Sequence, residues 1–222
     1  MIDVVATGFS DVATIRRQVP LPETADELCE VAADLGVDPM SHVYLGATAT
    51  ESTVKRLSAV GALAKYRIVH FATHAALAGQ LSSKAEPGLL LTPPDKPSEY
   101  DDGYLTASEV AALKLDAEWV ILSACNTAGG EAKGAEALSG LARAFFYAGA
   151  RSLLVSHWAV ASDSTVKLID KAVAELQANP RIGRAEALRR SMLSLMTTGA
   201  DVEAHPSFWA PFVLVGEGSA TR

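Results

Sequence analysis

The stretch Trp119-Val-Ile-Leu-Ser-Ala-Cys-Asn-Thr127 decides the expected fold. Its first four residues are apolar, as in a strand buried on both faces, and a polar end containing Cys125 follows them. A similar strand is expected at Tyr66-Arg-Ile-Val-His-Phe-Ala72, shortly before His74. Helical spacing separates such strands over most of the chain, so the sequence predicts an α/β domain whose central sheet is largely parallel and flanked by helices.

The rest of the chain is organised around these strands. Residues 1–20 show little periodicity and are interpreted as an extended lead-in or linker remnant, and residues 21–222 as the folded domain. Thr24-Ala-Asp-Glu27 and Thr106-Ala-Ser-Glu109 each match the capping box that opens a helix, and His42-Val-Tyr-Leu45 reads as a short strand. The glycines and prolines of residues 78–103 indicate surface loops.

Composition restricts the function classes. The 222 residues carry 19 basic and 26 acidic side chains, a formal charge of −7, which argues against generic binding to nucleic acid or to an anionic membrane. The first ten residues do not form a signal peptide, and no uninterrupted apolar stretch reaches the length of a membrane span. With only two cysteines, Cys29 and Cys125, a reducing, cytoplasmic location is expected.

His74 and Cys125 are the residues whose placement suggests chemistry. Each follows a buried strand, and reactive groups gather at the carboxyl ends of strands in open α/β sheets. If the two strands are neighbours, an imidazole lies beside a thiol that it can deprotonate. The gap of 125 − 74 = 51 residues is close to the roughly 50 residues given for caspases. Spacing alone leaves a second interpretation open, in which Cys125 is a small buried thiol and His74 a hydrogen-bonded loop residue.

Other residues and mechanisms are less favoured. His70 lies four residues before His74, but a strand lacks the helical geometry of a two-histidine zinc site, so His70 is interpreted as a packing residue and no metal is expected. Cys29 borders the apolar face of its helix, which also indicates packing. The chain contains neither a phosphate-binding loop nor the Gly-x-Ser-x-Gly motif of serine hydrolases.

Several motifs, taken in order, resemble a known family. They are His70-Phe-Ala-Thr-His74, Gly88-Leu-Leu-Leu91, Asp102-Gly-Tyr-Leu-Thr106, Leu122-Ser-Ala-Cys-Asn-Thr127, Ala142-Arg-Ala-Phe-Phe-Tyr-Ala-Gly-Ala150 and His205-Pro-Ser-Phe-Trp-Ala-Pro-Phe212. Together they resemble the CHAT domain, a caspase-like cysteine peptidase domain related to separase and usually found after tetratricopeptide repeats. The resemblance runs from about Leu21 to Gly218 and implies a caspase-like layered fold.

The resemblance also implies roles for single residues. His74 matches the general base and Cys125 the nucleophile, and the backbone N–H groups of Ala75 and Cys125 match the oxyanion hole. The family often has glycine at the position of Ala75, but alanine keeps the N–H donor. The segment containing His157 and Trp158 resembles the wall of the substrate pocket.

Asp163 is the candidate partner for a basic P1 side chain, although it lies one place later than the acidic residues of many relatives. It has an equally good interpretation as a helix N-cap. A protein or peptide substrate is expected, and no cofactor is required. The sequence lacks the 34-residue period of tetratricopeptide repeats, so regulation is expected from a tetratricopeptide-repeat or other segment that this sequence does not contain. The alternative is a non-catalytic interaction module with the same fold. A nucleotide-binding domain is a weaker alternative, because the chain has no phosphate-binding loop.

Overall fold

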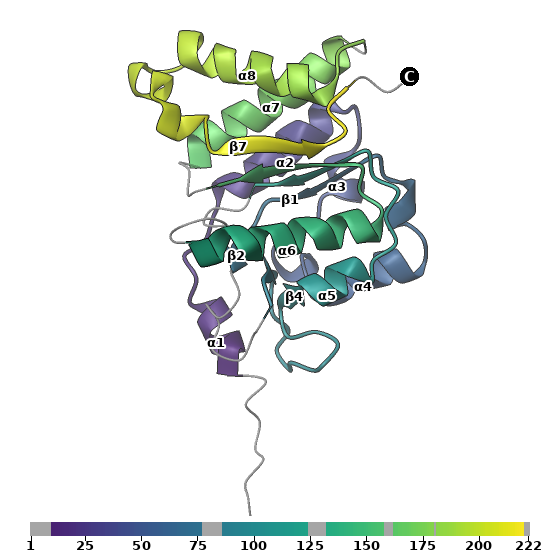
Figure 1. Ribbon diagram of the computed structural model, residues 1–222. Coiled ribbons are helices and arrows are strands. Elements are labelled where there is room, and N and C mark those ends of the chain that lie inside the picture. Colours follow the sequence, from purple (N-terminus) through teal and green to yellow (C-terminus); the bar gives the residue numbers. More distant parts are fainter. Residues whose placement is uncertain (1–9, 77–85, 124–131, 158–161, 180, 220–222) are drawn as a thin grey trace, which may run out of the picture.

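Four strands form the central sheet in the computed structural model, which describes residues 10–76, 86–123, 132–157, 162–179 and 181–219 (Figure 1). Their bounds are β1 (Ile68–Phe71), β5 (Trp119–Leu122), β6 (Ser152–Ser156) and β7 (Phe212–Gly216), in the spatial order β1-β5-β6-β7. The pairs β1–β5 and β5–β6 are parallel, and β6–β7 is antiparallel. The predicted α/β class and largely parallel sheet are therefore confirmed.

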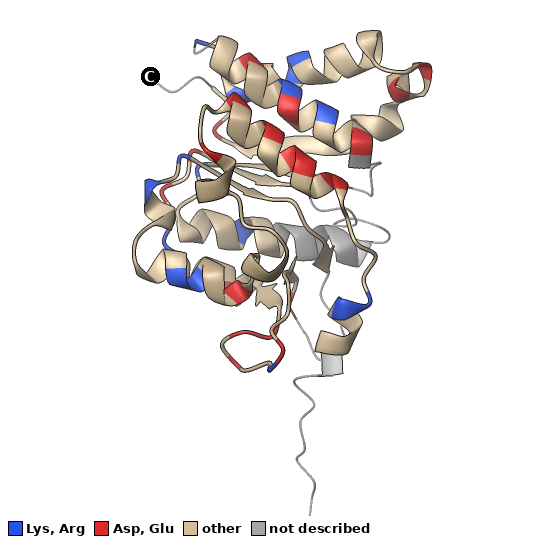
Figure 2. Cartoon of the chain, turned by 180° about the vertical axis from the view of Figure 1, so that it is seen from behind, with Lys and Arg blue, Asp and Glu red and all other residues tan. Residues whose placement is uncertain are grey.

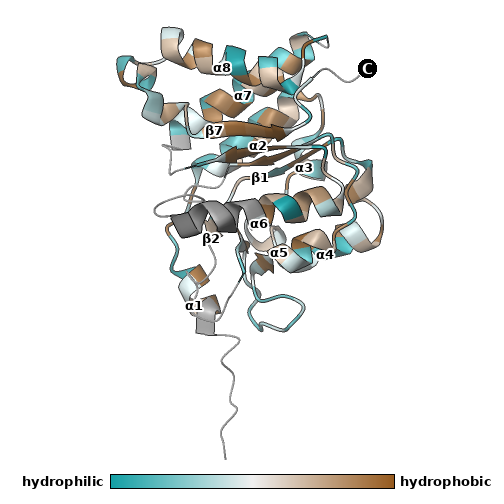
Figure 3. Ribbon diagram, in the orientation of Figure 1, coloured by the Kyte–Doolittle hydropathy of each residue, from teal (hydrophilic) through white to brown (hydrophobic). Residues whose placement is uncertain are grey.

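Alternation along β5 explains why helices cover both faces of this sheet. Val120 and Leu122 belong to one apolar cluster, whereas Trp119 and Ile121 belong to another. All four residues are at most 1% exposed, as expected when successive side chains point to opposite buried faces. Figure 3 shows the strands as the most hydrophobic elements between the helices.

The helices form one layer on each face of the sheet. Residues of α2, α7 and α8 pack in the cluster of Trp119, and residues of α4, α5 and α6 pack in the cluster of Val120. The bounds are α2 (Glu23–Asp34), α4 (Glu51–Ala59), α5 (Ala107–Ala111), α6 (Ala132–Ala148), α7 (Ser162–Ala178) and α8 (Arg184–Thr198). This arrangement of helix, sheet and helix is consistent with a caspase-like layered fold (Figure 1). None of the helices in the described ranges is long and apolar enough to cross a membrane.

A second, antiparallel sheet lies beyond the carboxyl end of β1. It consists of β2 (Ala75–Ala76), β3 (Gly88–Leu90) and β4 (Tyr104–Thr106), in that order. Tyr104, 0% exposed, packs with Ile15 of α1 (Ser10–Arg16) in a small cluster beside this sheet. Because β2 begins immediately after His74, the small sheet fixes the chain on the far side of that histidine.

Short helices complete the described chain. Their bounds are α3 (Pro39–His42), η1 (Gly46–Thr48), η2 (Leu63–Lys65), η3 (Asp201–Ala204) and η4 (Pro206–Phe208). The predicted strand at His42–Leu45 is wrong, because Asp38 caps α3 by accepting a hydrogen bond from the Met40 N–H, 3.1 Å away, and the helix takes residues up to His42. The lead-in is not extended throughout, since it contains α1.

The two predicted capping boxes have different outcomes. Thr106 caps α5 as predicted, with its side chain and that of Glu109 bonded reciprocally. The box at Thr24 is wrong, because α2 begins at Glu23 and Thr24 lies inside the first turn, where its hydroxyl donates to the Leu21 carbonyl at 2.7 Å. Glu27 is thereby free to point into the core, where it is 2% exposed.

Candidate active site

The two strands that precede His74 and Cys125 are parallel neighbours with matched ends. In the register of β1 and β5, Phe71 lies opposite Leu122. His74 is 74 − 71 = 3 residues beyond the first of these, and Cys125 is 125 − 122 = 3 residues beyond the second. The segments that follow β1 and β5 therefore leave the sheet at the same edge. Reactive groups of α/β domains gather at this edge.

His74 is held by a backbone carbonyl of the lead-in. Its Nε2 lies 2.8 Å from the carbonyl oxygen of Val19. A carbonyl only accepts hydrogen bonds, so Nε2 carries the proton, and in the neutral ring Nδ1 keeps its lone pair. The backbone of His74 is fixed as well, because its own carbonyl accepts a 2.8 Å bond from the Leu90 N–H. In the neutral ring, Nδ1 is therefore the nitrogen that can take a proton.

The remaining predicted machinery is described only in part. Ala75 opens β2 and is 8% exposed, opposite Leu89 of β3. Cys125 lies outside the described residues, so the separation of the two candidate catalytic side chains and the oxyanion hole stay predictions. Ser123, 5% exposed, is the last described residue before Cys125, and its N–H donates to the Phe71 carbonyl at 3.1 Å.

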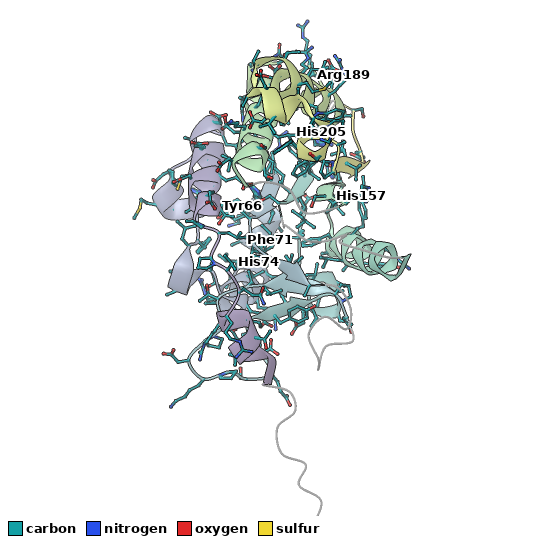
Figure 4. All side chains as sticks on the ribbon, turned by 90° about the vertical axis from the view of Figure 1, so that its left-hand side faces the viewer. Tyr66, Phe71, His74, His157, Arg189 and His205 are labelled. Atoms are coloured by element: carbon teal, nitrogen blue, oxygen red, sulfur yellow. The ribbon has the colours of Figure 1, made fainter. Side chains whose placement is uncertain are left out.

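The predicted substrate wall lies beyond β6. His157 is exposed, and its N–H donates to the Pro211 carbonyl at 2.9 Å, which ties the end of β6 to the segment before β7. Asp163 is exposed in the first turn of α7, which begins at Ser162, so its alternative interpretation as the N-cap is wrong. Trp158 lies outside the described residues. Figure 4 shows His74 beside Phe71, with His157 on the side toward His205.

A cavity of about 1120 Å³ extends along β1 to His74. Leu28 and Val31 of α2 line one side of it, and the whole run from Ile68 to His74 lines the other. The Val19 carbonyl that binds His74 belongs to another lining residue, whereas neither His157 nor Asp163 contributes to this cavity. His74 is thus accessible from the side of α2 as well as from the expected direction of the thiol.

Behind the candidate base lies a buried polar cluster formed by Glu27, His70 and Ser123. His70 Nε2 is 2.9 Å from Ser123 Oγ and 2.8 Å from Glu27 Oε1. The side chain of His70 is 6% exposed and that of Glu27 2%. The side chain of His70 is buried, as expected for a packing residue, but its neighbours are polar, so apolar packing does not describe its environment. Within the described ranges, no group of three or more His, Cys, Asp or Glu side chains is arranged to hold a metal.

Two features of the site were missed by sequence reasoning. The Val19 carbonyl has no sequence signal, because every residue carries this group and only the path of the chain brings it to His74. Glu27 did carry a signal, since an acidic residue at a core-facing helix position needs a buried partner. Its spacing from Thr24 imitated a capping box and gave the wrong explanation.

Comparisons with known proteins agree with the motifs. The family model described as the CHAT domain matches residues 8–217. Tetratricopeptide repeat protein 28 of mouse is 27% identical over 228 residues, which cover 89% of this chain and 9% of that protein. The human protein of the same name is 28% identical, over 89% of this chain and 8% of its own length. The chain therefore spans less than a tenth of the curated relatives that it matches.

Proposed function

Because the chain belongs to the CHAT domain family, a caspase-like family, we propose that it is a cysteine endopeptidase in which His74 is the base and Cys125 the nucleophile. The observation that carries the proposal is the matched exit of the two chains from β1 and β5, three residues after the register pair Phe71–Leu122. Equal offsets at the same sheet edge support proximity of the imidazole and the thiol, which nucleophilic catalysis requires.

The hydrogen bond to Val19 supports the role of His74 as a base. With its proton on Nε2, the ring offers Nδ1 to the thiol of Cys125. The resulting thiolate attacks the peptide carbonyl, and the N–H groups of Ala75 and Cys125 stabilise the oxyanion. His74 then returns the proton to the leaving amine, and water releases the acyl group from sulfur. The residues supply all of these steps without a cofactor.

The proposed substrate is a protein or peptide with an arginine or lysine at P1. His157 and Trp158 would form the pocket wall, and the exposed carboxylate of Asp163 would pair with the basic side chain. The formal charge of −7 favours approach of a basic segment. The cavity along β1 supports access of an extended chain to His74.

Regulation through the lead-in is part of the proposal. The named relatives are tetratricopeptide repeat proteins, so we propose that a repeat-containing or other segment controls residues 21–222 through residues 1–20. The contact from Val19 to His74 supports this route, because movement of the lead-in would change the orientation of the base. The acidic charge and the two cysteines support a cytoplasmic location.

Cleavage of a peptide library by the intact chain and by its Cys125→Ala variant tests the proposal directly. We expect cleavage after basic residues that disappears in the variant. Alkylation with iodoacetamide, followed at each cysteine by mass spectrometry, is the second arm. Cys125 should react much faster than Cys29, and His74→Ala should abolish the difference. Equal reactivity of the two thiols together with no cleavage would instead indicate a non-catalytic interaction module.

A further inference from the structure

The buried cluster of Glu27, His70 and Ser123 joins three separate elements at the sheet edge where β1 and β5 end. Glu27 comes from α2, His70 from β1, and Ser123 directly follows β5. The sequence separations are 70 − 27 = 43 and 123 − 70 = 53 residues, so none of these contacts is local. The mechanism proposed above uses none of the three side chains.

The geometry defines the direction of the central hydrogen bond. Glu27 Oε1 lies 2.8 Å from His70 Nε2, off the direction of a hydrogen bond. A carboxylate oxygen repels an imidazole lone pair at this distance and attracts an N–H, which places a proton on Nε2. That N–H donates to Ser123 Oγ, 2.9 Å away. The carboxylate therefore orients the ring, and the ring orients the hydroxyl.

The cluster is unusual because burial makes it costly. Glu27 and Ser123 are only 2% and 5% exposed. Apolar side chains of similar volume could fill these buried positions, yet polar side chains occupy them. Moreover, His70 Nδ1 and Glu27 Oε1 have no hydrogen-bond partner within the described part of the chain. Buried polar groups with incomplete hydrogen bonding are rare, and each one calls for an explanation beyond packing.

The cluster's position relative to both candidate catalytic residues supplies that explanation. Ser123 is held through its N–H by Phe71 and through its hydroxyl by His70, and Cys125 follows two residues later. His70 belongs to the neighbouring strand, β1, and lies four residues before His74. The exit of β5 is thus hydrogen-bonded to an imidazole that belongs to β1, and Glu27 of α2 lies beside the same ring.

We propose that Glu27, His70 and Ser123 are positioning residues. They align the segment after β5, which carries the thiol, with the segment after β1, which carries the base. The proposal rests on the proposed peptidase function. A displacement of about 1 Å in a reacting group can lower a rate about 10²-fold. Loss of a hydrogen bond that fixes the segment leaving β5 should therefore change the rate measurably. None of the three side chains needs to touch the substrate.

Alkylation of Cys125 by iodoacetamide in the full chain tests the proposal. Ser123→Ala removes only the hydroxyl, and Ser152→Ala is the matched control. Ser152 is 0% exposed at the start of β6, and its hydroxyl donates to the Glu118 carbonyl at 2.7 Å. We expect Ser123→Ala to slow the alkylation of Cys125 about 10-fold and Ser152→Ala less than 2-fold. Cys29 should react at the same rate in both variants.

Two further readouts separate positioning from general destabilisation. The midpoint of the alkylation rate against pH should rise for Cys125 in Ser123→Ala, toward the midpoint of Cys29, and should not move in Ser152→Ala. Glu27→Gln keeps the shape of the side chain and removes its charge. We expect it to slow the alkylation of Cys125 by a similar factor. Because both variants act through His70, the double variant should show little additional loss.

The outcomes distinguish the two proposals. Equal effects of Ser123→Ala and Ser152→Ala on Cys125, with His74→Ala still slowing its alkylation, would overturn the positioning role and leave the peptidase proposal standing. Parallel acceleration of Cys29 and Cys125 would indicate local unfolding and would also overturn it. If His74→Ala does not change the reactivity of Cys125, the peptidase proposal fails and the positioning role fails with it.

Discussion

His70 and His74 are four residues apart in the chain, but they occupy opposite environments. The side chain of His70 is 6% exposed and has a carboxylate and a hydroxyl beside one ring nitrogen. His74 is partly exposed, and among the described residues its ring is hydrogen-bonded to the main-chain carbonyl of Val19. The first environment immobilises an imidazole, whereas the second orients it and leaves Nδ1 available for proton transfer. Residue type and spacing therefore do not assign a role until the partners of each ring are known.

The largest expected effect concerns the available imidazole. In His74→Ala we expect peptide cleavage to fall about 10³-fold, within the range for loss of a general acid–base group, and the melting temperature to change little. The matched control is His42→Ala, since a ring nitrogen of His42 also lies within hydrogen-bond distance of a main-chain carbonyl, that of Asp38, at 3.1 Å. Steady-state kinetics and a thermal melt measure both variants. Equal activity of His74→Ala and His42→Ala would contradict a catalytic role for His74.

The buried imidazole should affect stability instead. His70→Leu leaves the carboxylate of Glu27 buried beside an apolar group, and we expect the free energy of unfolding to fall by about 3 kcal/mol. Urea denaturation measures this loss. His74→Ala should change the same quantity by less than about 0.5 kcal/mol, as is usual for a surface substitution.

A double substitution checks the cause of that loss. In Glu27→Leu with His70→Leu no unpaired carboxylate remains, and buried ion pairs are often replaced by apolar residues without loss of stability. We therefore expect the double variant to regain most of the stability that His70→Leu loses. If the two single losses simply add, the residues do not interact in the folded protein and the reading of the buried cluster is wrong.

The same contrast shows what the sequence could predict. Apolar runs predicted both β1 and β5, and the motif order gave the family. The expected burial is confirmed for β5, whereas β1 is an edge strand in which all residues but Phe71 are only half-buried. Contacts made by main-chain groups, such as the one from Val19, are independent of residue type and left no pattern. The buried role of Glu27 depends on a helix that begins at Glu23, one residue before Thr24, and helix boundaries are weakly encoded.

Asp163 extends the comparison to the proposed pocket, with a smaller expected effect. If it holds a basic P1 side chain, Asp163→Asn should reduce kcat/KM for cleavage after arginine by an amount on the order of 2–3 kcal/mol in transition-state binding. Its exposed position in the first turn of α7 also suits a contribution to the helix dipole alone. Unchanged cleavage would support that structural role, and a library preference for aspartate or aliphatic P1 residues would exclude a basic pocket.

The smallest expected effect concerns Asp170, a partly buried carboxylate whose neighbours include other carboxylates. Burial raises the pKa of Asp170 to about 6, with further contributions from Asp34 and Glu30 across the packed helices α2 and α7. Figure 2 shows that acidic residues recur along neighbouring helices on this face. Because the folded state binds this proton more tightly than the unfolded state, protonation stabilises the fold. The stabilisation is complete below about pH 4 and is lost as the pH rises through 6.

Asp170→Asn should therefore stabilise the protein at pH 7.5, by about 1 kcal/mol once solvent screening of this partly exposed group is allowed for. It should also flatten the dependence of stability on pH between 4 and 6. Asp95→Asn, at an exposed loop position, is the control for the chemical change. Urea denaturation across this pH range measures both effects. A variant that keeps the slope of the parent chain would show that Asp170 does not titrate in this pH range, and that the carboxylate between α2 and α7 is as well solvated as one in a loop.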